Sequence, residues 1–120
     1  MHSKYRLKKS FQFNYIYRRG KSLASKEMAL YFAPNRNGNL KIGVSVSKKI
    51  GKSAVRNRIK RVFKEAARSL LPRIDRRYSY ILVARMNAED SSFVEVVHTL
   101  ESLLKKAGCI DNEVSNSSAN

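Results

Sequence analysis

KKIGKSAVRNRIKRVFKEAARSLL, residues 48–71, decides the fold because its apolar and basic side chains separate at helical spacing. Apolar residues recur every three or four positions, which is typical of an amphipathic helix with one buried face. That face comprises Val55, Ile59, Val62, Phe63, Ala66 and Leu70. The opposite side comprises Asn57, Lys60, Arg61, Lys64 and Arg68, with Arg56 and Arg58 at its flanks. One face must therefore be buried, and the other must meet water or a polyanion.

The size and charge of the chain favour one small domain with a polyanionic partner. At 120 residues it can bury a single modest core. The net charge is +16, and it is concentrated: residues 1–88 contain 23 basic and 3 acidic side chains, whereas residues 89–120 contain 2 basic and 6 acidic ones. Such a body repels itself unless a polyanion is bound, and surfaces that are merely solvated usually mix both signs. Nucleic acid is the expected partner.

Membranes and protein-bound metals are poorer candidates. No apolar run approaches the roughly 18 to 20 residues of a spanning helix, and the N-terminus lacks the apolar region of a signal peptide. A basic amphipathic helix can also lie on anionic lipid, but here its apolar face is needed for the core. A single cysteine, Cys109, and two distant histidines offer no metal-ligand spacing. We expect a cytoplasmic protein with no membrane partner and no metal site.

The N-terminal part contains an unusual number of aromatic side chains. Residues 1–9 precede any periodic pattern and are interpreted as a flexible or phosphate-tracking basic arm. The next residues, from Ser10 to Gly20, have the spacing and the end signals of a short helix. Its aromatic residues are Phe11, Phe13, Tyr15 and Tyr17. For Phe11 and Tyr15 core packing is one of two alternatives that the sequence leaves open, and for Phe13 and Tyr17 a nucleotide-facing role competes with it.

The remaining elements follow from alternation and from capping signals. Residues 23–34 and 40–47 alternate between apolar and small or polar side chains across a turn signal, which predicts an antiparallel hairpin. Residues 78–85 include a run that is apolar on both faces, as in a central strand. A capping box at Ser92 opens an amphipathic closing helix that ends at Gly108. The domain is expected over residues 10–108, followed by a disordered tail over residues 109–120.

One face of the predicted hairpin has room for a ligand. It places Tyr31 beside the small residues Gly43 and Ser45. An aromatic ring over a floor of small side chains suits a stacked base. Lys41 and Lys48 are expected to hold the phosphates at the rim.

Residues 1–88, which we call the basic body, contain few side chains that could perform chemistry. A protein nuclease normally needs paired carboxylates for metal ions or a histidine placed as a general base. The acids within residues 1–88 are Glu27, Glu65 and Asp75. Glu65 is expected to screen Arg58 or Arg61 on its own helix. Neither histidine has a nearby nucleophile, so the sequence indicates binding and predicts no catalytic residue.

Several motifs in order resemble one known family. They are Leu7-Lys8-Lys9, the Phe13 to Tyr17 spacing with Gly20, the strand GVSVSKK at residues 43–49, and Arg56-Asn57-Arg58 followed by Lys60-Arg61. On these residues, and over about residues 5–107, the chain resembles the protein subunit of bacterial ribonuclease P. The Ser53-Ala54 pair departs slightly from the family's commoner Ala-Val pairing. This departure touches the start of the helix and leaves the basic face unchanged.

The resemblance implies both a fold and an activity. The fold is an α/β (α+β) two-layer sandwich, in which a small mixed β-sheet packs with three helices and a left-handed βαβ crossover surrounds the basic helix. In that family the protein binds a catalytic RNA, which cuts the 5′ leader from precursor tRNA with magnesium ions bound mainly by the RNA. The implied partners are the ribonuclease P RNA and precursor tRNA, with no further protein required. The protein is expected to bind the leader and to lower the magnesium requirement.

The resemblance also implies which residues touch RNA. A leader-binding cleft between the first helix and the sheet would comprise Phe13, Tyr17, Tyr31 and Ser45. The surface for the catalytic RNA would comprise Lys48, Lys49, Lys52, Arg56, Asn57, Arg58, Lys60, Arg61, Lys64 and Arg68. A ribosomal protein that binds rRNA structurally would share the charge and the size, and a protein-only nuclease is a third alternative. Cleavage of precursor tRNA with and without the catalytic RNA separates the three.

Overall fold

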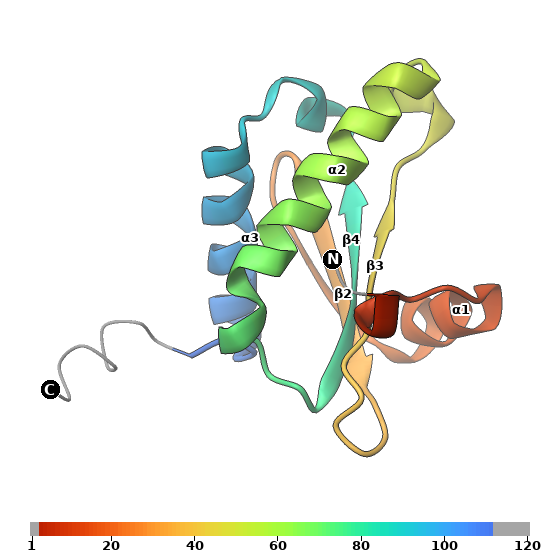
Figure 1. The fold of residues 1–120 in the computed structure, drawn as a ribbon, viewed down its shortest axis with the longest axis vertical. Coiled ribbons are helices and arrows are strands. Elements are labelled where there is room, and N and C mark those ends of the chain that lie inside the picture. The colour runs from red at the N-terminus through yellow and green to blue at the C-terminus, as the bar shows by residue number, and fades with distance from the viewer. Residues whose placement is uncertain (1–2, 112–120) are drawn as a thin grey trace, which may run out of the picture.

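The computed structural model describes residues 3–111, which form a four-stranded sheet with helices on both faces (Figure 1). The strands are β1 (Lys21–Ala24), β2 (Met28–Pro34), β3 (Ile42–Ser45) and β4 (Tyr78–Ala84). The α-helices are α1 (Ser10–Arg19), α2 (Ser53–Leu70) and α3 (Phe93–Ala107). The 3-10 turns are η1 (Ser3–Tyr5), η2 (Lys48–Ile50), η3 (Leu71–Arg73) and η4 (Met86–Asp90). This confirms the predicted mixed sheet with three helices.

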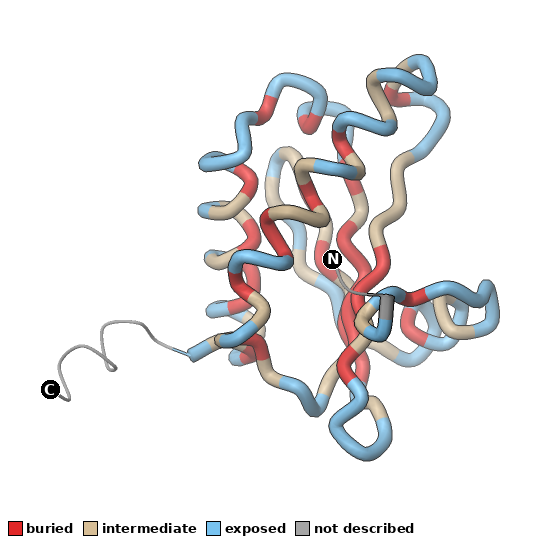
Figure 2. The backbone as a smooth tube through the Cα atoms, in the orientation of Figure 1, coloured by how far each residue is buried: buried red, intermediate tan, exposed pale blue. Residues whose placement is uncertain are grey.

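The main core lies between the sheet and the pair α2 and α3. The apolar stripe of α2 supplies Ile59, Phe63 and Ala66, all of which are almost fully buried. They join the side chains on one face of the strands, such as Leu30 and Leu82, and the buried tube segments in Figure 2 follow these elements. The periodicity of residues 48–71 therefore predicted the buried face correctly. A smaller cluster lies under α1 on the other face of the sheet.

The connection from β3 through α2 to β4 is left-handed. The two strands are parallel neighbours. In Figure 1 both run upward, α2 lies on the viewer's side of them, and the chain steps from β3 to β4 on its left. About 98% of such connections in proteins have the opposite hand. The hand follows the expectation drawn from the family resemblance, and no periodicity in the sequence indicates it.

The predicted hairpin between residues 23–34 and 40–47 is wrong. The strand order is β1-β2-β4-β3, so β4 lies between the two stretches. β2 instead forms its hairpin with β1, of which only Leu23 and Ala24 lie within the predicted stretch 23–34. The reason is that β4 is apolar on both faces and is buried along most of its length. Such a strand is stable at the centre of the sheet, where both faces are covered and both edges are paired.

The two ends of the domain extend beyond the predicted boundaries. Leu7 is buried, and its N–H donates to the carbonyl of Ile42 at 3.0 Å, so the segment before α1 is held against β3 rather than free. Cys109 is buried as well, and Ile110 forms a bridge with Ile74. The rest of the predicted tail, residues 112–120, lies outside the described residues, as do residues 1 and 2.

Candidate nucleic-acid interface

The basic face of α2 is turned away from the core. On this side Asn57, Arg58, Arg61 and Arg68 are exposed, whereas Arg56, Lys60 and Lys64 are half-buried. From Asn57 to Arg68 the stripe is about 16 Å long, given the helical rise. Lys48, Lys49 and Lys52 are exposed just before the helix, where Ile50 is buried and anchors the η2 turn. All ten predicted residues therefore belong to one continuous stretch of η2 and α2.

Two of these ten side chains already have partners within the chain. Arg58 donates from Nη1 to the carbonyl of Glu89 at 2.9 Å, which ties α2 to the η4 turn. Arg68 forms an ion pair with Glu65 at 2.7 Å. This hydrogen-bonded guanidinium lowers the pKa of Glu65 and the carboxylate raises that of Arg68. The expectation that Glu65 screens Arg58 or Arg61 is thus wrong, because the partner lies one turn later.

The aromatic residues Phe13, Tyr17 and Tyr31 gather on the opposite face of the sheet. α1 runs across the strand direction there (Figure 1), and its Phe13 packs on the small cluster that includes Ile81 and Leu7. The rings of Tyr17 and Tyr31 meet edge to face, with centroids 4.9 Å apart. Tyr17 keeps 38% of its surface exposed, so the pair is open to a ligand.

Short side chains border this aromatic group, as predicted. Ser45 lies opposite Val83 in the sheet register, and Val83 lies opposite Ala29, which gives a half-buried row beside α1. We call Phe13, Tyr17, Tyr31 and Ser45 the aromatic face. The predicted rim residue Lys41 does not border it, because Lys41 lines a hollow on the other flank of α1. α1 crosses this side of the sheet and separates Lys41 from the aromatic face.

Gly43 fixes the position of the Phe13 ring, and Gly43→Ala is expected to disturb it. A Cβ atom at this position would lie 2.7 Å from two ring atoms of Phe13 and 3.1 Å from the Cβ of Leu7. The ring must move, and overpacking of this kind typically costs about 1–3 kcal/mol. Melting temperature and the affinities for RNA with and without an unpaired 5′ extension would measure the effect. An unchanged melting temperature together with unchanged affinities would contradict this packing.

Sequence reasoning missed two exposed aromatic residues on α1. Of the two alternatives that the sequence leaves open for Phe11 and Tyr15, core packing is excluded, because they are 67% and 51% exposed. Their i, i+4 spacing places them on one side of α1, one turn apart. The buried position of the helix is Ile16, so Phe11 and Tyr15 lie on a flank of α1 beside the small cluster and not within it. Helical spacing relative to Ile16 could have shown this.

The acids of the basic body do not form a metal centre. Among the described residues no group of three or more His, Cys, Asp or Glu side chains could hold an ion. Glu27 accepts from the Ser25 hydroxyl, Glu65 pairs with Arg68, and Asp75 pairs with Arg77 at 2.7 Å. The hydrogen-bonded Arg77 holds the pKa of Asp75 below its ordinary value. Over residues 3–111 no helix is long and apolar enough to cross a membrane.

The domain is small and basic, with a charged helix face on one side and an aromatic face on the other. These features are typical of nucleic-acid-binding modules. Comparison with known proteins identifies the member of this class. The sequence model of the family described as Ribonuclease P matches residues 1–108. The chain belongs to the ribonuclease P protein family.

Individual relatives agree with the family match. The ribonuclease P protein component of Clostridium kluyveri is 43% identical over 106 residues, which cover 87% of this chain and 95% of the relative. The solved RNase P protein of Staphylococcus aureus has a TM-score of 0.81 and 33% identity over 89% of this chain and 98% of its own. That of Thermotoga maritima has a TM-score of 0.77 and 27% identity, with coverage of 89% and 98%.

Proposed function

We propose that this chain binds the catalytic RNA of ribonuclease P through the basic stretch of η2 and α2, and holds the 5′ leader of precursor tRNA on the aromatic face. Family membership makes the chain the protein component of a tRNA-processing endoribonuclease; the assignment of surfaces is the proposal. The observation that carries it is the continuity of the two surfaces along the chain. β3 places Ser45 on the aromatic face and leads directly to Lys48 and Lys49.

The basic stretch suits a structured RNA. Lys and Arg side chains along one helix face contact phosphates and fix the orientation of the RNA without reading its bases. Arg58 already donates to the carbonyl of Glu89, and Arg68 forms an ion pair with Glu65. Most of the RNA contact on α2 is therefore expected to come from Lys60, Arg61 and Lys64. Structured RNA is recognised mainly by shape and backbone, which this rigid row of cations matches.

The aromatic face suits a single strand. Rings stack on unpaired bases with little preference for sequence, and nearby cations follow the backbone. Tyr17 and Tyr31 offer ring edges and faces beside the short side chains of Ser45 and Ala29. A leader of any sequence would therefore be held, whereas mature tRNA would lack this contact.

The chemistry of cleavage is proposed to belong to the RNA and its magnesium ions. The carboxylates of the basic body are engaged with Ser25, Arg68 and Arg77, so their donor set does not fit a magnesium site. The contribution of the chain would be electrostatic: cations beside the RNA neutralise phosphates that magnesium would otherwise have to screen. A lower magnesium requirement follows.

Reconstitution of the catalytic RNA with and without this protein tests the proposal. The expected result is cleavage of the 5′ leader with half-maximal activity at a lower magnesium concentration when the protein is present, with no other protein added. An unchanged magnesium requirement would contradict the electrostatic role. No effect on cleavage at all would favour a structural rRNA-binding protein, and cleavage by the protein without the RNA would favour a protein-only nuclease.

A further inference from the structure

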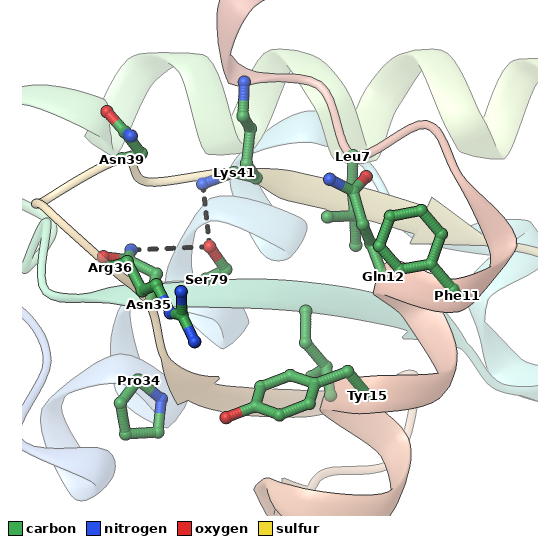
Figure 3. Close-up of a pocket in the computed structure, with 11 residues that line it drawn as sticks. Leu7, Phe11, Gln12, Tyr15, Pro34, Asn35, Arg36, Asn39, Lys41 and Ser79 are labelled. Carbon is green, nitrogen blue, oxygen red and sulfur yellow. Dashed lines mark hydrogen bonds between the residues drawn. The ribbon is translucent and has the colours of Figure 1, made fainter.

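We propose that this chain has a second site for an unpaired RNA nucleotide, on the flank of α1 opposite to the aromatic face. The site is a hollow of about 450 Å³ between α1 and the connection from β2 to β3 (Figure 3). On one side it is lined by Phe11 and Tyr15 of α1, and on the other by Arg36, Asn39 and Lys41. Its size is within the range of small-molecule sites, which is about 300–1,000 Å³.

The exposure of the two rings is the first observation. Phe11 and Tyr15 are 67% and 51% exposed, although large aromatic side chains usually contribute to a core. Ile16 and Leu7 form the buried floor of the same hollow, so the rings stand at its edge over an apolar base. Exposed rings over such a floor form a stacking platform, and every base has an aromatic face that it can accept.

The polar side of the hollow fits the rest of a nucleotide. None of the lining residues is acidic, and two of them, Arg36 and Lys41, are cations. The backbone here is fixed: Ser79 Oγ accepts hydrogen bonds from the Lys41 N–H at 3.1 Å and from Asn35 Nδ2 at 3.4 Å (Figure 3). A base stacked on Tyr15 would have its phosphate toward Arg36, and amide side chains within reach of its edge.

The site continues along α1. A neighbouring hollow of about 460 Å³ shares Phe11 and Tyr15 and adds Arg18 and Arg19. Cations thus lie on both sides of the aromatic pair. In this arrangement they can contact the RNA backbone on either side of a stacked base. The pattern differs from that of a protein-binding groove, because charged residues are depleted at the centres of protein interfaces.

An RNA nucleotide is the occupant that the charge favours. A second copy of this chain would bring another body of net charge +16 against Arg18, Arg19 and Arg36, and would be repelled. The inference needs only RNA binding and not the assignment of the leader to the aromatic face. The nucleotide could come from precursor tRNA or from the catalytic RNA, which share this chemistry.

Binding of a fluorescent oligouridylate to the purified full-length protein tests the site. The measurements are made in a Tyr31→Ala background, so that the aromatic face contributes less. Adding Tyr15→Ala is expected to weaken binding by roughly fivefold to a hundredfold, the loss of one stacked base. Phe93→Ala is the matched control, because this ring is 44% exposed on α3 and remote from α1 in sequence. Equal affinity of the Tyr15→Ala protein and its parent would overturn the proposal, as would a Tyr15-dependent affinity for an acidic peptide but not for RNA.

Crosslinking in the reconstituted ribonucleoprotein identifies the source of the nucleotide. A photoreactive ring is introduced as Tyr15→p-benzoylphenylalanine, and crosslinks to precursor tRNA and to the catalytic RNA are analysed separately. A crosslink to either RNA supports the site and names its source. Absence of both, while the same group at Tyr31 crosslinks, would overturn it and leave the proposed function standing. If the photoreactive group at Tyr31 alone failed to crosslink, only the proposed role of the aromatic face would be contradicted.

Discussion

Replacing Lys60, Arg61 and Lys64 together by alanine is expected to weaken binding of the catalytic RNA by a few hundredfold at 0.1 M salt. Each lost phosphate contact reduces the log–log dependence of affinity on salt by about 0.7–0.9, so three contacts flatten the slope by roughly 2 to 3 units. The change should leave the fold intact, since none of the three side chains belongs to the buried stripe of α2: Arg61 is exposed, and Lys60 and Lys64 are half-buried at its flank. Affinity measured over a range of salt concentrations gives the slope directly.

The matched control for this variant removes two cations elsewhere. Lys105 and Lys106 are exposed at the end of α3, so their replacement by alanine changes net charge without touching α2. It is expected to change the slope by well under one unit. The single variants Arg58→Ala and Arg61→Ala should each flatten the salt slope by about one unit at most. Arg58→Ala should also release the η4 turn, because it removes the hydrogen bond to Glu89. A salt slope unchanged in the triple variant would remove α2 from the RNA-binding surface.

Tyr31→Ala is expected to cost about 1–3 kcal/mol in binding of precursor tRNA and to spare mature tRNA. The physical reason is the loss of one stacking ring, together with the edge-to-face contact that orients Tyr17. The measurement is the ratio of the two affinities for the reconstituted ribonucleoprotein. Tyr31→Phe keeps the ring and should restore the ratio. Equal losses on both RNAs would indicate that Tyr31, which packs on the small cluster, acts through folding instead.

Much of the fold could be predicted because its helices carry local signals. The apolar stripe of α2, from Val55 to Leu70, repeats over about four turns. The Ser92–Glu95 capping box begins α3, and Gly108, in the left-handed conformation, ends it. Strand pairing could not be predicted in the same way. Alternation in residues 40–47 says that a strand forms, but not which neighbour it pairs with, and the nearest neighbour in sequence is not its partner. Pairing with β4 depends on burial of the whole sheet.

The candidate site, like the fold, could be predicted from the sequence only in part. Strand alternation predicted that Tyr31 and Gly43 share a side of the sheet, and they do. That Phe13 lies on the same side was implied by the family resemblance alone, and Phe13 does pack there. The packing angle of α1 could not be predicted, because it depends on how Leu7 and Ile16 settle on the sheet. Consequently the sequence predicts the wrong flank for Lys41 and leaves the positions of Phe11 and Tyr15 open.

The parallel pairing of β3 with β4 governs when the domain can fold on the ribosome. Among residues 3–111, β3 pairs with β4, which begins at Tyr78, and otherwise forms one isolated bridge with Arg6. At typical synthesis rates β4 emerges several seconds after Ser45. Until then the nascent chain is highly cationic and lacks its central strand, so it is exposed to any nearby RNA. Because α3, which completes the main core, follows β4 in the chain, a selectively binding domain can form only after both have emerged.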